Sequence, residues 1–168
     1  LLLKATLETA LASNNVEVNT SSPGGGFGNI TVSSPVTWAS AHTLKLNAAS
    51  SITVNNSVSG LNGTLSLQSG GSISNNSGAG LMHVDKLEAR ASSGITLQGL
   101  NQISNLAANS FGGSVLVEAA APGGLNIDTV GSTTGVSGYG SVTIKQHNAG
   151  DITVKKNVSS GMAGAVTL

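Results

Sequence analysis

The sequence contains no cysteine, and it has few aromatic and few charged residues. Without cysteine, the chain can form no disulfide framework, no thiolate metal site and no cysteine nucleophile. Aromatic residues make up 2% and charged residues 8% of the 168 positions, and seven basic residues balance seven acidic ones. A chain with no net charge and no basic stripe lacks the electrostatic footprint of a nucleic-acid-binding protein. We therefore expect no nucleic-acid partner.

Long hydrophobic runs are also missing. The first twelve residues, LLLKATLETALA, end in a small-x-small pattern that resembles a signal-peptide cleavage site, but polar residues interrupt the apolar segment that such a peptide needs. Leu3, Leu7 and Leu11 recur every four residues, as on one face of an amphipathic helix. We expect a short helix within residues 1–15 that covers one end of a core. With no initiator methionine and no membrane-spanning run, we expect a mature chain or a fragment.

Glycine is abundant, and one short phrase built of apolar residues around a threonine returns along the chain. It reads GNITV at 28–32, SSITV at 50–54, SGITL at 93–97 and GDITV at 150–154. Alternation of apolar and polar residues over so few positions is typical of a half-buried strand. The sequence therefore predicts many short strands.

The apolar pairs of these strands form two interleaved series. The first members of the first series are Ile30, Ile52, Ile73, Ile95, Leu125 and Ile152. Those of the second series are Leu44, Leu65, Leu87, Val115, Val142 and Val166, with Val16 ahead of them. Steps of 21 to 30 residues within each series are typical of a solenoid, in which stacking of the repeats buries the core.

We predict an all-β fold, a right-handed parallel β-helix of about six coils over residues 16–168. Coils this short hold strands but no helix, and β-crossovers are almost always right-handed. The two longest coils are expected to carry their extra residues in loops outside the core, at 105–113 and 132–140. The glycine-rich segment PGGGFG at 23–28 is expected to be a turn.

Two columns of outward-facing residues follow from this register. The residues between the apolar pairs of the first series are Thr31, Thr53, Ser74, Thr96, Asn126 and Thr153. The residues three positions after the anchors of the second series are Asn47, Gln68, Arg90, Glu118 and Lys145. The last three alternate in charge. Because this register gives Glu118 and Lys145 the same position on adjacent coils, we expect them to be neighbours.

Enzymes built on β-helices need carboxylates that converge on one face. The five acidic residues of the repeat region fall in different positions of the coil: Asp85, Glu88, Glu118, Asp128 and Asp151. The nearest approach to a site is a run of alternating polar residues, His83, Asp85, Lys86, Glu88 and Arg90, which we interpret mainly as a solvated strand edge.

Other candidate residues also have simpler structural explanations. His42, His83 and His147 are unrelated in spacing, which does not favour a metal site. Trp38 could be an exposed platform for a sugar, but a single tryptophan at a strand end more often packs against the core. Six sequons begin at Asn19, Asn29, Asn55, Asn62, Asn75 and Asn157, a number only slightly above chance. We predict no catalytic, cofactor-binding or metal-binding residue.

Residues 36–60, VTWASAHTLKLNAASSITVNNSVSG, and LETALASNNVEVNTSSPGGGFGNITV upstream resemble the large exoproteins of bacterial two-partner secretion, the filamentous-haemagglutinin and high-molecular-weight adhesin family. The resemblance is most specific between Leu7 and Asn56. It implies a right-handed parallel β-helix that is exported through an outer-membrane transporter and then displayed at the cell surface or released. The N-P-N-G type motif of the family's secretion domain is missing, so the resemblance implies a shaft segment.

Two classes of function follow. The first is a structural and adhesive shaft, which binds a receptor or glycan on a host or neighbouring cell, or forms the stalk of a contact-dependent toxin. The second is a carbohydrate-active β-helix enzyme, a polysaccharide lyase or hydrolase. Because the chain stops at GAVTL without a capping element, we also expect either further chain or end-to-end self-association.

Overall fold

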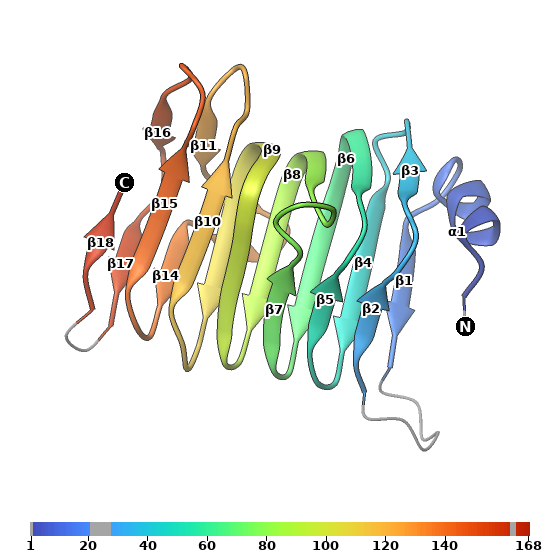
Figure 1. Ribbon diagram of the computed structural model, residues 1–168, viewed down its shortest axis with the longest axis horizontal. Coiled ribbons are helices and arrows are strands. Elements are labelled where there is room, and N and C mark those ends of the chain that lie inside the picture. Colours follow the sequence, from blue (N-terminus) through green and yellow to red (C-terminus); the bar gives the residue numbers. More distant parts are fainter. Residues whose placement is uncertain (1, 21–27, 162–163) are drawn as a thin grey trace.

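The computed structural model is a parallel β-helix of about six turns with one short helix at its amino-terminal end (Figure 1). It describes residues 2–20, 28–161 and 164–168. Most of the predicted turn PGGGFG lies outside the described residues. The predicted fold class is confirmed, and the right hand of the coil stays a prediction from the crossover rule.

The strands stack into three faces that run along the rod. Face 1 holds β1 (Val16–Asn19), β4 (Thr43–Ala48), the second halves of β6 (Val58–Ser69) and β8 (Met82–Ala91), the end of β9 (Gly94–Ser110), β11 (Leu125–Ile127), β14 (Val136–Gly138), β16 (Ile152–Val154) and β17 (Val158–Ser160). Face 2 holds β2 (Ile30–Val32), β5 (Ile52–Val54), β7 (Ser72–Asn75), the start of β9, β10 (Val115–Ala119), β15 (Val142–Gln146) and β18 (Val166–Thr167). Face 3 holds β3 (Val36–Trp38), the first halves of β6 and β8, and the middle of β9.

Two apolar ladders line the core between these faces, and only their last members, Val154 and Val166, are strongly exposed. The ladder of face 2 is Ile30, Ile52, Ile73, Ile95, Val115, Val142 and Val166. The ladder of face 1 is Val16, Leu44, Leu65, Leu87, Leu106, Ile127 and Val154. The predicted series are therefore confirmed up to Ile95 and Leu87. The next step of each series is wrong, because Val115 follows Ile95 and Leu106 follows Leu87. The later steps, from Val115 to Val142 and Val166 and from Leu125 to Ile152, are confirmed.

The error has a local cause in residues 105–113, which were expected to form a loop outside the core. Residues 105–110 are the last part of β9, and Leu106, Ala107 and Ala108 are buried. Alanine and asparagine are uncommon in strands, so the segment does not look like one. It becomes a strand because β8 offers a complete set of hydrogen-bonding partners, from Lys86 opposite Asn105 onward.

The second predicted loop, 132–140, is only partly a loop. Val136 to Gly138 form β14 of face 1. The extra residues lie just before it, where β12 (Thr129–Val130) and β13 (Thr133–Thr134) make a small antiparallel hairpin.

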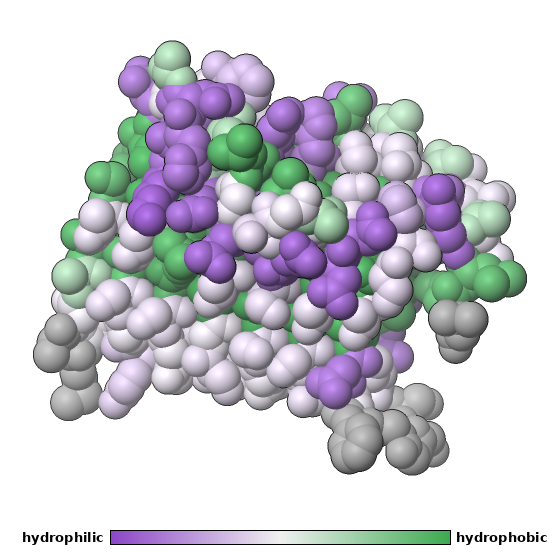
Figure 2. Space-filling view, viewed as in Figure 1, coloured by the Kyte–Doolittle hydropathy of each residue, from purple (hydrophilic) through white to green (hydrophobic). Residues whose placement is uncertain are grey.

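The outward columns change with the register. Thr31, Thr53, Ser74 and Thr96 form one column as predicted, but its continuation is Leu116, Thr143 and Thr167. Asn126 and Thr153 belong to face 1 instead. In Figure 2, which shows the side of face 2, much of the lower half is white, the colour of residues with intermediate hydropathy.

The predicted charged column is confirmed for Glu118 and Lys145 but is wrong for Arg90. Glu118 and Lys145 are paired on adjacent strands, and the Nζ of Lys145 lies 3.3 Å from Oε1 of Glu118. Arg90 is not part of this column, because it lies on face 1 between Gln68 and Asn109.

Helix α1 (Lys4–Leu11) lies against the first coil, as Figure 1 shows. Leu7 and Leu11 are buried, but Leu3 is 64% exposed, so the predicted apolar face is shorter by one leucine. Polar contacts hold the helix to β3 and its following turn: Oε1 of Glu8 accepts a hydrogen bond from the backbone N–H of Thr37, and Oγ of Ser40 donates to the carbonyl of Leu11. In the described part of the chain, no helix has the length and apolar character needed to cross a membrane.

Trp38 is a core residue. Only 4% of it is exposed, and its Nε1 donates a hydrogen bond of 3.0 Å to the carbonyl of His42. Gly60, which pairs with Trp38 on the next coil, and Gly63 leave room for the indole, since a Cβ atom at either position would overlap the ring. Trp38 therefore does not form a surface platform for a sugar.

Candidate functional site

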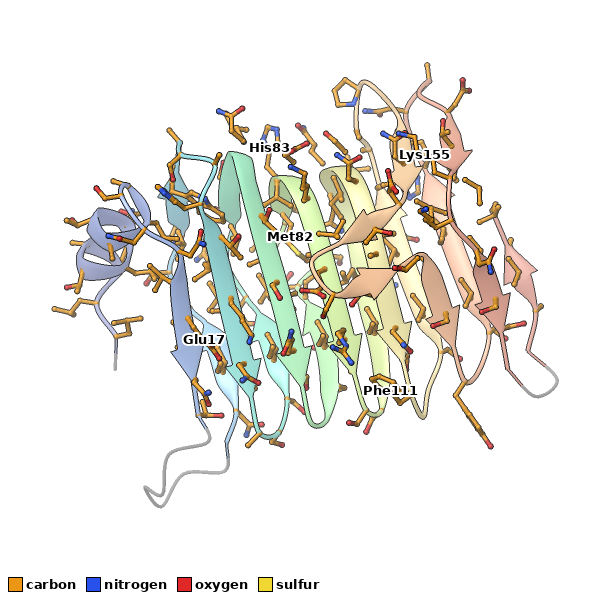
Figure 3. The ribbon with its side chains drawn as sticks, turned by 180° about the vertical axis from the view of Figure 1, so that it is seen from behind. Glu17, Met82, His83, Phe111 and Lys155 are labelled. Atoms are coloured by element: carbon orange, nitrogen blue, oxygen red, sulfur yellow. The ribbon has the colours of Figure 1, made fainter. Side chains whose placement is uncertain are left out.

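The most elaborate part of the surface is on face 1, where the β12–β13 hairpin folds over the sheet. The hairpin leaves the sheet between β11 and β14 and reaches back over β9 to β8. In Figure 3, which shows this side, its two short orange strands lie across the ribbon. Outward-facing side chains beneath it are buried: Ser66 is 4% exposed, Glu88 4% and Ala107 0%.

The carboxylate of Glu88 is the anchor of the hairpin. Its Oε1 accepts hydrogen bonds from the backbone N–H of Ser132 at 3.0 Å, from Oγ of Ser132 at 3.0 Å and from Oγ1 of Thr133 at 2.8 Å. Its Oε2 accepts one of 2.7 Å from Oγ of Ser66. Gly131 (φ +58°) lies against the same carboxylate, where a Cβ atom would come within 2.6 Å of Oε2. The hairpin loop is thus shaped around a buried negative charge.

Burial and hydrogen bonding act on this carboxylate in opposite directions. Burial raises the pKa of Glu88, because it disfavours the charged form. The hydrogen bonds from Ser66, Thr133 and Ser132 favour the charged form and outweigh burial, so the pKa of Glu88 lies below its ordinary value. Glu88 is therefore a stable anion at neutral pH, with the properties of a structural anchor.

Arg90 stands beside the hairpin on the same strand. Its Nη1 donates a hydrogen bond of 3.2 Å to Oγ of Ser132, the hydroxyl that itself donates to Glu88. The guanidinium lies over the ring of Phe111, with Cζ 5.7 Å from the ring centroid. Phe111 is 55% exposed and follows the end of β9. Figure 3 shows it at the edge of the sheet, at the turn out of face 1.

A shallow hollow of about 250 Å³ adjoins this pair. It is lined by Asn47, Gln68, Ser69, Arg90 and Phe111. We call these five residues the Arg90–Phe111 hollow. It brings together an aromatic face, a guanidinium and side-chain amides, which are groups that bind polar ligands with apolar faces.

The predicted polar run at 83–90 is divided by the structure. Asp85 is paired with its neighbour Lys86, with 3.1 Å between Oδ2 and Nζ, and also accepts a hydrogen bond from Nδ2 of Asn105. His83 is exposed on face 3. Glu88 is buried rather than solvated, which corrects its interpretation as part of an exposed strand edge. The run does not converge on a common point.

A second polar group surrounds Glu118. Its Oε2 accepts a hydrogen bond of 2.9 Å from the backbone N–H of Gly99, and Nε2 of His147 lies 3.9 Å from the same oxygen. The hydrogen bond from Gly99 has the largest effect and lowers the pKa of Glu118. Burial raises it by less, and the hydrogen bond and charge of Lys145 lower it further. The carboxylate of Glu118 therefore joins three segments of the chain, and we interpret its role as structural.

The remaining candidate residues are histidines and the asparagines of the sequons. Nδ1 of His42 lies 3.1 Å from the carbonyl oxygen of Leu11, in the joint between the helix and the first coil. Within residues 2–20, 28–161 and 164–168, no three His, Asp or Glu side chains are grouped as metal ligands. Of the sequon asparagines, Asn75 uses its amide to hold the carbonyls of Gly80 and Gln98. The side chains of Asn55 and Asn157 are exposed.

Two features of this site were not predicted. The hairpin has a sequence signal, because Gly131 and Ser132 separate two short β-branched segments as in a two-residue turn. Phe111 was assigned to a loop, and its meeting with Arg90 depends on the register of Arg90 with Asn109. That register follows from the strand at 105–110.

The fold defines the chain as a parallel β-helix of the solenoid class. Comparison with known proteins finds no match to this chain among family models, curated proteins or solved structures.

Proposed function

We propose that the chain is a structural and adhesive shaft segment of a secreted bacterial surface exoprotein of the filamentous-haemagglutinin and high-molecular-weight adhesin type. The resemblance in residues 7–56 supports the family. On this proposal, the chain acts outside the cell or at its surface and is not an enzyme. Its partners are a receptor or glycan on a host or neighbouring cell, the outer-membrane transporter during export, and other copies through end-to-end self-association.

The observation that carries the proposal is the use of the acidic side chains. Six of the seven carboxylates take part in contacts that join segments or neighbouring residues of the chain: Glu8, Glu17, Asp85, Glu88, Glu118 and Asp128. Catalytic carboxylates of a lyase or hydrolase are instead directed at a substrate. Acidic groups that hold coils, a helix and a hairpin in place support the role of a structural rod.

The test compares binding with depolymerisation. The purified chain is coupled to beads, and retention of cells and of glycans is measured beside the release of reducing ends from pectin, hyaluronan and a bacterial glycan. We expect retention without release. Release that Asp85→Asn abolishes and Asp151→Asn leaves unchanged would establish the alternative, a carbohydrate-active enzyme. Asp151 is a suitable control because it is exposed on the last coil.

A further inference from the structure

We propose that the Arg90–Phe111 hollow is a binding site for a neutral hexose glycan, with one pyranose ring stacked on Phe111. The inference rests on the proposed adhesive function and names the ligand class and the residues that bind it. It begins from Phe111, a large apolar ring that is 55% exposed beside polar side chains.

Two amide side chains beside Arg90 have unused hydrogen-bonding capacity. Gln68 and Asn109 are the strand neighbours of Arg90 on either side. The side-chain amides of Gln68 and Asn109 make no hydrogen bond within the described part of the chain, and Arg90 makes a single polar contact, to Ser132. Each amide offers both donors and an acceptor, which match the hydroxyl groups of a sugar.

The spacing of these groups suits a polymer. Gln68, Arg90 and Asn109 occupy the same position on three successive coils, so they are separated by one strand spacing, roughly 4.8 Å. Asn47 precedes them in the same row. A pyranose in an extended chain is of about this length, so successive sugars can meet successive coils. The row therefore favours a linear glycan that lies along the rod.

The local charge argues for an uncharged ligand. Arg90 is the only arginine of the chain, and the carboxylate of Glu88 lies close to it, because both side chains bind the same hydroxyl of Ser132. An approaching carboxylate would meet a pair with little net charge and would be close to a buried anion. A neutral sugar can use the guanidinium as a hydrogen-bond donor without this repulsion.

The hairpin positions the site. Ser132 binds Nη1 of Arg90 from one side, and the ring of Phe111 supports the guanidinium from the other. The planar group is therefore held before a ligand arrives, which lowers the entropy cost of binding. Because the guanidinium lies over one face of the Phe111 ring, the sugar stacks on the opposite face, and Arg90 is its hydrogen-bonding neighbour.

The experiment is calorimetric titration of the whole chain with cellohexaose, mannohexaose, galactohexaose and hexagalacturonate. We expect binding of at least one neutral hexaose, at least a tenfold loss of affinity in Phe111→Ala, and a several-fold loss in Arg90→Lys, which keeps the charge but not the planar donor group. The control is Tyr139→Ala, which removes the other strongly exposed aromatic residue among those that the structure describes and should leave the affinity unchanged. Circular dichroism and the thermal midpoint confirm that each variant is folded.

Several results would overturn the inference: no binding of any neutral hexaose, equal binding by Phe111→Ala, or preference for hexagalacturonate. Bead adhesion is measured on the same variants. If Phe111→Ala keeps full adhesion, this site is wrong while the shaft function stands. If the unmodified chain shows no adhesion, the proposed function itself fails.

Discussion

Oγ1 of Thr133 donates a hydrogen bond of 2.8 Å to Oε1 of Glu88, a residue 45 positions earlier in the chain. Glu88 belongs to β8, whereas Thr133 belongs to the hairpin between β11 and β14. The bond therefore crosses over β9 and joins three successive coils on face 1. Ladder hydrogen bonds join only neighbouring strands, so this contact adds a connection of longer range.

We predict that Glu88→Gln lowers the free energy of unfolding by about 1–3 kcal/mol at pH 7, because donors that meet a carboxylate would then meet an amide. The hydrogen bonds lower the pKa of Glu88 in the folded protein. The stabilisation of the folded protein by these hydrogen bonds is therefore complete above the unfolded-state pKa of glutamate, about 4.3. It is lost as the pH falls through the lower folded-state pKa of Glu88.

Denaturant unfolding between pH 7 and pH 3 tests this prediction. The difference between the unmodified chain and Glu88→Gln should be largest at pH 7 and should shrink in the acidic range. The matched control is Glu17→Gln, since Glu17 lies in the same row of face 1 but is exposed, and it should change stability little. A pH-independent difference would contradict the anchoring role.

Gly60→Ala should destabilise the first coils by about 1–3 kcal/mol, because the new methyl group would overlap the indole of Trp38. Trp38 is the only tryptophan, so its fluorescence reports the change directly. Gly123→Ala is the control, since nothing lies within 4 Å of the added Cβ atom. Gly60→Ala should be tolerated better in a Trp38→Phe background; equal effects in both backgrounds would show that the indole is not the cause.

Asn101→Ala should cost roughly 2–4 kcal/mol, because Asn101 is fully buried and satisfies three backbone groups. Its Nδ2 donates to the carbonyls of Gln98 and Glu118, and its Oδ1 accepts from the N–H of Met82. Thermal unfolding of Asn101→Ala beside Asn62→Ala, an exposed asparagine with one contact to Ala39, separates this role from a general effect of losing an amide.

The Glu118–Lys145 pair should contribute only about 0.2–1 kcal/mol in a double-mutant cycle, because the Lys145 side chain is 52% exposed. Glu118→Ala should cost more than Lys145→Ala, since Oε2 of Glu118 also accepts a hydrogen bond from Gly99. The coupling energy should decrease in high salt, as measured by urea unfolding at two ionic strengths. A salt-independent coupling would indicate that charge is not its source.

The sequence predicts the fold well where every coil repeats the same apolar pairs, as from Ile30 to Ile95. It fails where a strand lacks that pattern. Ala107 and Ala108 carry little β preference, and their strand exists because β8 lies beside it. That missed strand shifted the later register and separated Arg90 from its true neighbour, Asn109.

The candidate site was less predictable than the fold, because it depends on contacts between coils. Glu88 was identified as a polar residue of β8, but its burial comes from a hairpin that starts 41 positions later at Thr129. Alternation predicts which side of a strand faces outward, and it gives no information on what covers that side.

The direction of the strands, across the long axis of the rod, determines how the molecule responds to tension. A pull on the two ends opens the ladder at one edge and removes one coil at a time, rather than shearing all hydrogen bonds together. A coil such as that from Leu44 to Leu65 adds about 5 Å to the folded rod but roughly 70 Å when extended. Single-molecule stretching should therefore show a series of extension steps at low force. The step that opens the coils joined by the Glu88 hairpin should require a higher force.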